Sequence, residues 1–260
     1  MIQEMIGSYL ESVRAIGRRT AQLHRALGSV PDDPGFSPEP FCEFYQRSMY
    51  QSLRATAIRA LRLLKLREAA LPENHRAQAR QVLEEEPAIL EEFGLLLKRR
   101  IQAQRIRCHG DFHLGQVLYT GKDFLIMDFE GEPARPVSER RIKRCPLRDV
   151  AGMLRSFQYA ADAALLARDA GTPVRPEDQA RLETWAAAWH TWVSTVFLRA
   201  YLEEAAEGRF LPEKREDLGI LLRLFLLEKA MYELSYELNH RPEWVRIPLR
   251  GILRLLDEKN

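Results

Sequence analysis

The sequence predicts a mainly α-helical fold with one small β-hairpin, which places it in the α+β class. Apolar residues recur at spacings of three and four over most of the chain, as on the buried face of an amphipathic helix. Two short apolar runs, Gln116–Tyr119 and Phe124–Met127, instead flank the polar turn Thr120–Asp123. That arrangement is typical of two strands joined by a tight turn. The segments on both sides of this hairpin show helical spacing.

Composition indicates an ordinary soluble globular protein. Hydrophobic residues make up 46% and charged residues 29%, and the formal net charge of +2 gives no reason to expect a nucleic-acid partner. The three cysteines, Cys42, Cys108 and Cys145, fit neither a disulfide framework nor a zinc motif. No apolar run is long enough for a signal peptide or a membrane span. We therefore expect a cytoplasmic protein that does not act at a membrane.

Three helices are predicted before the hairpin. Residues 3–28 form the first helix, and Gly28 closes it as a C-cap. A proline-rich linker follows, because proline lacks the N–H that a helix interior needs. Helical spacing resumes near Glu43 and stops before Pro72, and a third helix covers roughly 73–104.

A basic loop is predicted after the hairpin, from Arg135 to Arg148. Its charges could face a phosphate, but a solvated loop is the favoured interpretation. A helix follows with Asp149 near its N-cap. Thr172–Pro173 and Arg175–Pro176 then break this helix.

The next helix, about residues 177–206, carries an aromatic stripe. Trp185, Trp189 and Trp192 stand four and three residues apart, so they share one helical face. A row of this kind usually belongs to a hydrophobic core, and a ligand platform is the less favoured interpretation. We therefore expect the three indoles to be buried.

Two further helices are predicted at the end of the chain. The first covers about 214–239, and its segment Leu218–Leu227 is apolar nearly all round, as in a buried helix. A polar-aromatic turn, NHRPEWVRIPL, follows it. The last helix runs from about Leu249 to Asp257.

The two ends of the hairpin carry the chemistry. Gln116 opens the first strand and Asp128 follows the second, so an antiparallel pairing makes them neighbours, with Asp111 on the loop just beyond. Carboxylate and amide oxygens suit Mg²⁺ that bridges nucleotide phosphates. Phosphoryl transfer needs positioning, charge neutralisation and a base for the acceptor hydroxyl. These residues predict that chemistry, although any aspartate can also simply cap a turn.

Other polar residues near the hairpin allow more than one role. We expect His109 to be buried and to hold the loop, with a direct chemical role as the alternative. For His113 the sequence favours neither a catalytic nor a structural role. Glu130 could reach the metal or the sugar. A nucleophilic Cys108 beside His109 and Asp111 is a different hypothesis, but triad members seldom come from adjacent positions.

The motifs resemble a known family of kinases. The loop HGDFHLGQVL and the strand end DFEGEP resemble the aminoglycoside-phosphotransferase-like small-molecule kinases. The longer run through IMDFEGEPARPVSERR and PLRDVAGMLRSF is similar to the maltokinases, including the kinase modules of trehalose synthase fusions. The resemblance implies transfer of phosphate from ATP to the anomeric hydroxyl of maltose. It implies Asp111 as base and Mg²⁺ on Gln116 and Asp128. It implies Glu130 as a neighbouring metal ligand or as a group that contacts the ligands from outside.

The resemblance also directs attention to a sugar-binding set in the tail. Sugars need paired polar groups for their hydroxyls and an aromatic face for their C–H side. An internal salt-bridge network with an indole in the core explains the same residues as well. The candidate substrate-binding residues are Lys229, Tyr232, Glu233, Glu237, Arg241 and Trp244.

One departure from the family concerns the nucleotide. Such kinases clamp ATP with an N-terminal lobe, and this sequence shows no Gly-rich strand–turn–strand and no strand lysine before Arg107. Residues 1–260 are therefore expected to form the C-terminal lobe alone, with weak or absent activity by itself. A missing N-terminal lobe or a trehalose synthase domain is the expected partner. The alternatives are another small alcohol as acceptor and a non-catalytic docking module.

Overall fold

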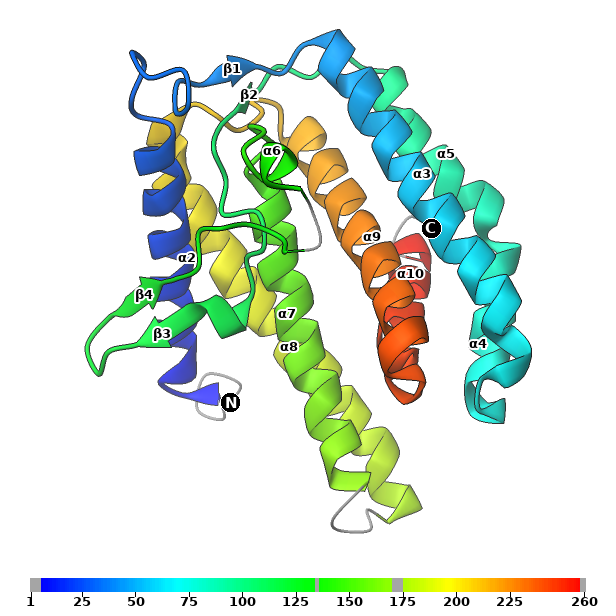
Figure 1. The fold of residues 1–260 in the computed structure, drawn as a ribbon. Helices are drawn as coiled ribbons and strands as arrows, with labels where there is room; N and C mark the ends of the chain where they lie inside the picture. Colours follow the sequence, from blue (N-terminus) through cyan, green and yellow to red (C-terminus); the bar gives the residue numbers. More distant parts are fainter. Residues whose placement is uncertain (1–5, 134–135, 170–174, 258–260) are drawn as a thin grey trace. The chain divides into compact units, whose positions relative to one another are not determined.

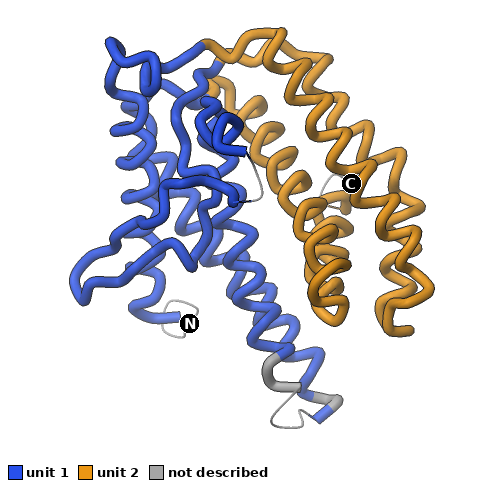
Figure 2. The backbone as a smooth tube through the Cα atoms, in the orientation of Figure 1, with its two compact units in different colours: residues 1–39, 103–211 blue, residues 40–102, 212–260 orange. Residues whose placement is uncertain are grey.

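The computed structural model describes residues 6–133, 136–169 and 175–257, so the predicted break at Thr172–Pro173 lies outside it. The chain divides into two compact units, shown in Figure 2. Unit 1 contains residues 1–39 and 103–211, and unit 2 contains residues 40–102 and 212–260. The short strands β1 (Glu39–Pro40) and β2 (Gln104–Arg105) lie where the chain passes between the units.

Unit 1 is built on three long helices and the hairpin (Figure 1). Gly17 lets two of the helices approach closely, because a Cβ at this position would lie 2.6 Å from the carbonyl oxygen of Phe197. The expected helices of this unit are confirmed, and Asp149 lies in the first turn of its helix, near the N-cap as predicted. The first helix begins at Tyr9, later than the predicted start at residue 3. The helices are α2 (Tyr9–Leu27), α7 (Leu147–Asp169) and α8 (Pro176–Ala205).

The aromatic stripe of α8 is not a core stripe. Trp185 is 40% exposed and Trp192 is 44% exposed, while Trp189 stacks on Tyr9 of α2 with ring centroids 5.6 Å apart. The prediction of three buried indoles is therefore wrong for two of them. The buried residues of α8 follow a neighbouring line of the helix, made by Val193, Phe197, Ala200 and Tyr201.

The hairpin is confirmed, with strands one residue shorter than predicted at their outer ends. β3 (Val117–Tyr119) pairs antiparallel with β4 (Phe124–Ile126), with Val117 opposite Ile126. The N–H of Met127 still donates to the carbonyl of Gln116 at 2.9 Å, so the chains stay side by side beyond the ladder. At the tip, Asp123 forms an ion pair with Arg19 of α2.

Unit 2 contains the remaining long helices. The predicted helix over 73–104 is wrong as a single element, because it breaks at Glu85 and a second helix begins there with a proline in its first turn. After Gly94 only a 3₁₀ turn, η2 (Leu95–Leu97), remains. The other predicted helices are confirmed, and the last one begins three residues early. The helices are α3 (Glu43–Arg67), α4 (Glu73–Glu84), α5 (Glu86–Gly94), α9 (Arg215–His240) and α10 (Arg246–Asp257).

The basic loop is less solvated than predicted. Residues 134–135 lie outside the described residues, and the loop then forms the short helix α6 (Val137–Arg140). Lys143 is buried, and its ammonium donates to the carbonyl of Pro34 at 2.6 Å and lies 3.0 Å from Glu39. A buried ammonium requires such partners, so this charge fixes the loop and does not face solvent.

The cysteines and the helices bear on disulfide bonds and on membrane spans. Cys42, Cys108 and Cys145 are all free thiols. No helix among the described residues is both long enough and apolar enough to span a bilayer.

Candidate active site

The loop before the hairpin is fixed from beneath by a buried carboxylate. Asp149 is 2% exposed, and it accepts hydrogen bonds from the backbone N–H of His109 at 2.7 Å and of Gly110 at 3.0 Å. Gly110 has φ +89°, a conformation that glycine adopts without strain. The backbone just before Asp111 is therefore held by α7, and this places the Asp111 carboxylate.

Asp149 in turn depends on a buried network with α2 and α8. Nε2 of His24 lies 3.0 Å from its carboxylate, and Nδ1 of His24 lies 2.9 Å from the hydroxyl of Tyr201. Burial raises the pKa of Asp149, but the hydrogen bond and charge of His24 and the N–H of Gly110 outweigh it, so the pKa stays lowered. Burial raises the pKa of Tyr201 well above its ordinary value, so its hydroxyl keeps its proton. The network thus holds an ionised carboxylate under the loop.

His109 occupies an interior position, as expected. It is 1% exposed, and its Nε2 lies 2.7 Å from the carbonyl oxygen of Met127 at the end of β4. Its Nδ1 accepts from the N–H of Asp111 at 3.4 Å. His109 therefore ties the loop to the far end of the hairpin, and a direct role in the reaction remains a prediction.

Asp111 and His113 lie close together on the same loop. Nε2 of His113 is 4.0 Å from a carboxylate oxygen of Asp111, whose side chain is 18% exposed. Nδ1 of His113 accepts from the N–H of Gly115 at 3.0 Å, which fixes the ring. A partly exposed carboxylate on an anchored loop suits a general base.

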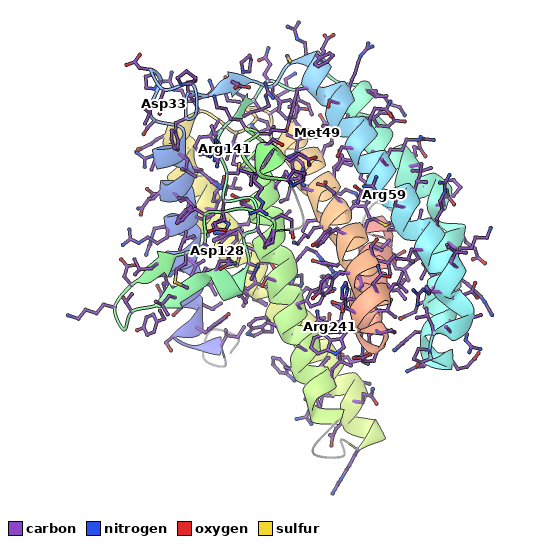
Figure 3. All side chains as sticks on the ribbon, in the orientation of Figure 1. Asp33, Met49, Arg59, Asp128, Arg141 and Arg241 are labelled. Atoms are coloured by element: carbon purple, nitrogen blue, oxygen red, sulfur yellow. The ribbon has the colours of Figure 1, made fainter. Side chains whose placement is uncertain are left out.

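Gln116 and Asp128 are neighbours, as the hairpin pairing predicts. Nε2 of Gln116 donates to Asp128 at 2.9 Å. Asp128 is exposed at the end of the hairpin (Figure 3), and its φ of +62° is unusual for a residue other than glycine. Glu130 is also exposed and forms no ion pair with a described residue. Its predicted contribution to a metal site stays untested.

The Gln116–Asp128 pair fits a hard divalent cation. Half a turn of the amide exchanges its nitrogen for its oxygen and sets two oxygens side by side, the ligand type that Mg²⁺ prefers. Within the described residues no three His, Cys, Asp or Glu side chains cluster as a metal site. A cation here would thus complete its shell with oxygens from water or phosphate, as is usual for Mg²⁺.

Cys108 does not suit the nucleophile hypothesis. Burial raises the pKa of its thiol well above the ordinary value, and the nearby Asp149 charge acts in the same direction. The reactive form of cysteine is the thiolate, which this environment disfavours. The sulfur instead lies 3.5 Å from the carbonyl oxygen of Arg144.

The predicted sugar-binding residues all lie in unit 2, at the end of α9. Glu237 is 1% exposed, and Arg241 donates to both of its oxygens, at 2.8 and 3.0 Å. The Arg241 guanidinium also lies 4.8 Å from the ring centre of Trp244 (Figure 3 labels Arg241). Glu233 is 8% exposed. The internal salt-bridge interpretation thus holds for Glu237 and Arg241.

The other two members of this set form a pair of their own. The ammonium of Lys229 lies 4.9 Å from the ring centre of Tyr232, at cation–π distance. Trp244 is half-buried in the 3₁₀ turn η5 (Pro242–Trp244), so it does not fill the core completely. An aromatic surface next to charged groups remains available at this end of unit 2.

Sequence reasoning missed His24 and Tyr201 and assigned Asp149 only a cap. No local pattern connects them, because His24 meets Asp149 across 125 positions and Tyr201 across 177 positions. The available signal was a histidine at position 24 on the apolar side of a predicted helix, where a polar side chain needs a buried partner.

Part of the chain matches a family of known proteins. Residues 7–132 match the phosphotransferase enzyme family. That stretch contains α2, the loop with Asp111, and the hairpin. Two relatives are the glucosamine kinases of Mycolicibacterium smegmatis, 30% identical over 152 residues, and of Streptacidiphilus jiangxiensis, 30% identical over 154 residues. These matches cover 58% and 59% of this chain.

Solved structures of a glucosamine kinase have the same fold. The complex with glucosamine, ADP and inorganic phosphate aligns over 96% of this chain with a TM-score of 0.74 and 23% identity. Crystal form A aligns over 95% with a TM-score of 0.73. The predicted aminoglycoside-phosphotransferase-like kinase fold is therefore confirmed. The chain spans about a third of the curated relatives, 34% and 32%, and 55% and 54% of these solved chains.

Proposed function

We propose that this chain is the catalytic and acceptor-binding portion of an ATP-dependent kinase that phosphorylates a hydroxyl group of a small sugar. The observation that carries the proposal is the 2.9 Å contact between Gln116 and Asp128 at the end of the hairpin. The anchored Asp111 loop precedes them in the same unit. Phosphoryl transfer needs this combination of a base and a neighbouring cation site.

Each residue has a defined task in this proposal. Asp111 accepts the proton of the attacking sugar hydroxyl, and His113 stabilises that carboxylate from 4.0 Å. Gln116 and Asp128 hold Mg²⁺, which neutralises charge on the phosphates of bound ATP. His109 and Asp149 keep the loop in register with the hairpin. An ATP-clamping lobe, the partner that the sequence predicts, completes the nucleotide site.

An amino sugar is one candidate acceptor. The relatives named above are glucosamine kinases, and α9 carries the buried carboxylates Glu228 and Glu233, 5% and 8% exposed. Buried carboxylates attract an ammonium group more strongly than a neutral hydroxyl. The match to the whole relatives is partial, so their acceptor enters here as a proposal for this chain.

Maltose is the second candidate acceptor, carried by the sequence resemblance to maltokinases. A neutral disaccharide needs aromatic faces and hydrogen-bonding pairs more than charge. Trp244 and Tyr232 provide aromatic surface at the end of α9, and Arg241 lies beside the indole. If maltose is the acceptor, substitution of Trp244 or Tyr232 should weaken maltose binding more than substitution of Glu233.

An acceptor panel separates these cases. ADP release is measured with ATP, Mg²⁺ and either glucosamine, maltose or glucose, using the chain alone and the polypeptide that includes the coding sequence upstream of Met1. We expect turnover in the longer polypeptide, weak or absent turnover in the chain alone, and a clear preference for one acceptor.

A binding measurement tests the site even where turnover is weak. Calorimetry of the chain with ATP should show binding that requires Mg²⁺, and Asp128→Asn should weaken this Mg²⁺-dependent binding. Arg59→Gln, a change on an exposed part of unit 2, is the matched control. Identical Mg²⁺-dependent binding by the wild type and Asp128→Asn would refute the cation assignment. No ATP binding and no turnover in either polypeptide would favour a docking module.

A further inference from the structure

We propose that unit 2 carries a separate site for the phosphate group of a small sugar phosphate, in a cavity at the start of α3. The cavity has a volume of about 500 Å³ and lies between the first turns of α3 and the residues around η2. That volume is in the range of small-molecule sites. None of the candidate active-site or sugar-binding residues described above lines it.

The residues that line the cavity carry more positive than negative charge. Arg47, Lys98 and Arg100 line it, and none of the three forms an ion pair with any described residue. Arg99 differs from them, because Glu216 and Asp217 already neutralise it. Glu43 is the one carboxylate among the lining residues, so three positive charges face one negative charge and the potential still favours an anion.

The start of α3 brings N–H donors to the cavity, together with the carboxylate of Glu43 in the same first turn. The helix is 25 residues long, and its N-cap residue, Cys42, offers no side-chain hydrogen bond to the first turn. The N–H groups of a first helical turn have no partners inside the helix and carry the positive end of the helix dipole. An anion in the cavity would meet both these groups and the three cations.

The walls of the cavity are held in place by a buried amide. Gln46 is 2% exposed, and its Nε2 donates to the carbonyls of Leu96 at 3.0 Å and Arg99 at 2.8 Å. Its Oε1 accepts from the N–H of Ile101 at 3.2 Å. These bonds join α3 to the segment that carries Lys98 and Arg100. A preformed site loses less conformational entropy on binding than a flexible surface.

The remaining polar groups identify the ligand class. Glu43, Tyr50 and Gln51 also line the cavity, and they offer acceptors and donors for hydroxyl groups. In a sugar phosphate, the phosphate group would contact the cations and the sugar hydroxyls would contact these three groups. The sugar part of this assignment rests on the proposed function, because a sugar kinase produces a sugar phosphate. Free phosphate and pyrophosphate share the anion chemistry alone.

Calorimetric titration of the chain tests the site. The titrants are pyrophosphate, inorganic phosphate, glucose 6-phosphate and glucose. EDTA is present and ATP is absent, so the hairpin cation site cannot contribute. We expect saturable binding of the phosphorylated ligands that weakens as salt increases, tighter binding of glucose 6-phosphate than of phosphate, and no binding of glucose. Lys98→Gln and Arg100→Gln should each weaken binding by about tenfold, the usual effect of losing one charge-assisted hydrogen bond.

Two variants distinguish the possible outcomes. Arg62→Gln removes the same charge from an exposed position of α3 outside the cavity and should leave the affinity unchanged. Asp128→Asn should also bind normally, so a failed kinase assay with normal titrations would refute only the proposed function. Absence of binding, or equal loss in Arg62→Gln and Lys98→Gln, would overturn the site. Equal affinity for phosphate and glucose 6-phosphate would overturn the sugar assignment.

Discussion

The hairpin end of unit 1 and the α9 end of unit 2 both carry conspicuous carboxylates, but they use them differently. Asp128 is exposed and receives a hydrogen bond from a neutral amide, Gln116. Glu237 is buried, and Arg241 occupies both of its oxygens. The first carboxylate is open to a cation or a phosphate-bound metal, whereas the second is already neutralised inside its own unit.

This difference separates a chemical role from a structural one. Removing a carboxylate that is open to a ligand should change ligand binding and leave stability nearly constant. Removing a carboxylate that is satisfied by its own chain should change stability first. The proposed function assigns Asp111 and Asp128 to the first kind, and the contacts of Asp149 and Glu237 place these two in the second.

The largest expected effect concerns Asp111. In the polypeptide that shows turnover, Asp111→Asn should lower kcat by about 10²- to 10⁴-fold, the usual contribution of a general base. The asparagine preserves the size and most of the hydrogen bonding of the side chain. ADP release measures the rate, and calorimetry should show unchanged ATP affinity. A variant with nearly normal kcat would show that another group removes the proton.

The next effect concerns the anchor beneath the loop. Asp149→Ala leaves donors of His24, His109 and Gly110 without their acceptor, so we expect a loss of about 3–5 kcal/mol in the free energy of unfolding. Urea unfolding measures it. Asp123→Ala is the control, because solvent screens the exposed pair of Asp123 with Arg19 and its loss should change stability little. Equal losses in both variants would contradict the anchoring role.

The same carboxylate gives a pH dependence with a definite sign. Because the folded-state pKa of Asp149 is lowered from 3.8, its stabilisation is complete above about pH 3.8 and disappears as the pH falls through the lower folded value. Asp149→Asn cannot ionise at this position. Its unfolding free energy should therefore fall less steeply than that of the wild type in this acid range, as measured by urea unfolding at each pH.

The local parts of this structure were predictable from sequence, and the long-range parts were not. Gln116 and Asp128 were placed together correctly because a hairpin register depends on a few neighbouring residues. The single helix over 73–104 failed because apolar spacing continues across Glu85 and Pro87 although the helix does not. The prediction that Trp185 and Trp192 are buried was wrong, because sharing a helical face does not specify whether that face packs against another helix. The His24–Asp149 contact joins distant segments that no local pattern connects.

A smaller effect tests the α9 end. Glu237→Gln keeps the shape but loses the charged bonds to Arg241, and we expect unfolding to become easier by about 1–3 kcal/mol. Urea unfolding measures this, with Glu243→Gln, an exposed change in the following turn, as control. If Trp244→Ala weakens acceptor binding while Glu237→Gln changes only stability, the two roles separate as proposed. Loss of acceptor binding without loss of stability in Glu237→Gln would instead make this carboxylate a ligand.

The smallest effect concerns His75, which faces the turn after α9. Burial and the charge of Arg246 lower the pKa of His75 below 6.5, so this side chain stabilises the folded state above about pH 6.5 and loses that contribution as the pH falls. His75→Gln should therefore make the unfolding free energy less dependent on pH between about 7 and 5. His240→Gln, at an exposed position of α9, should leave the wild-type slope intact. Parallel slopes for the wild type and His75→Gln would show that the protonation of His75 does not contribute to the pH dependence of stability.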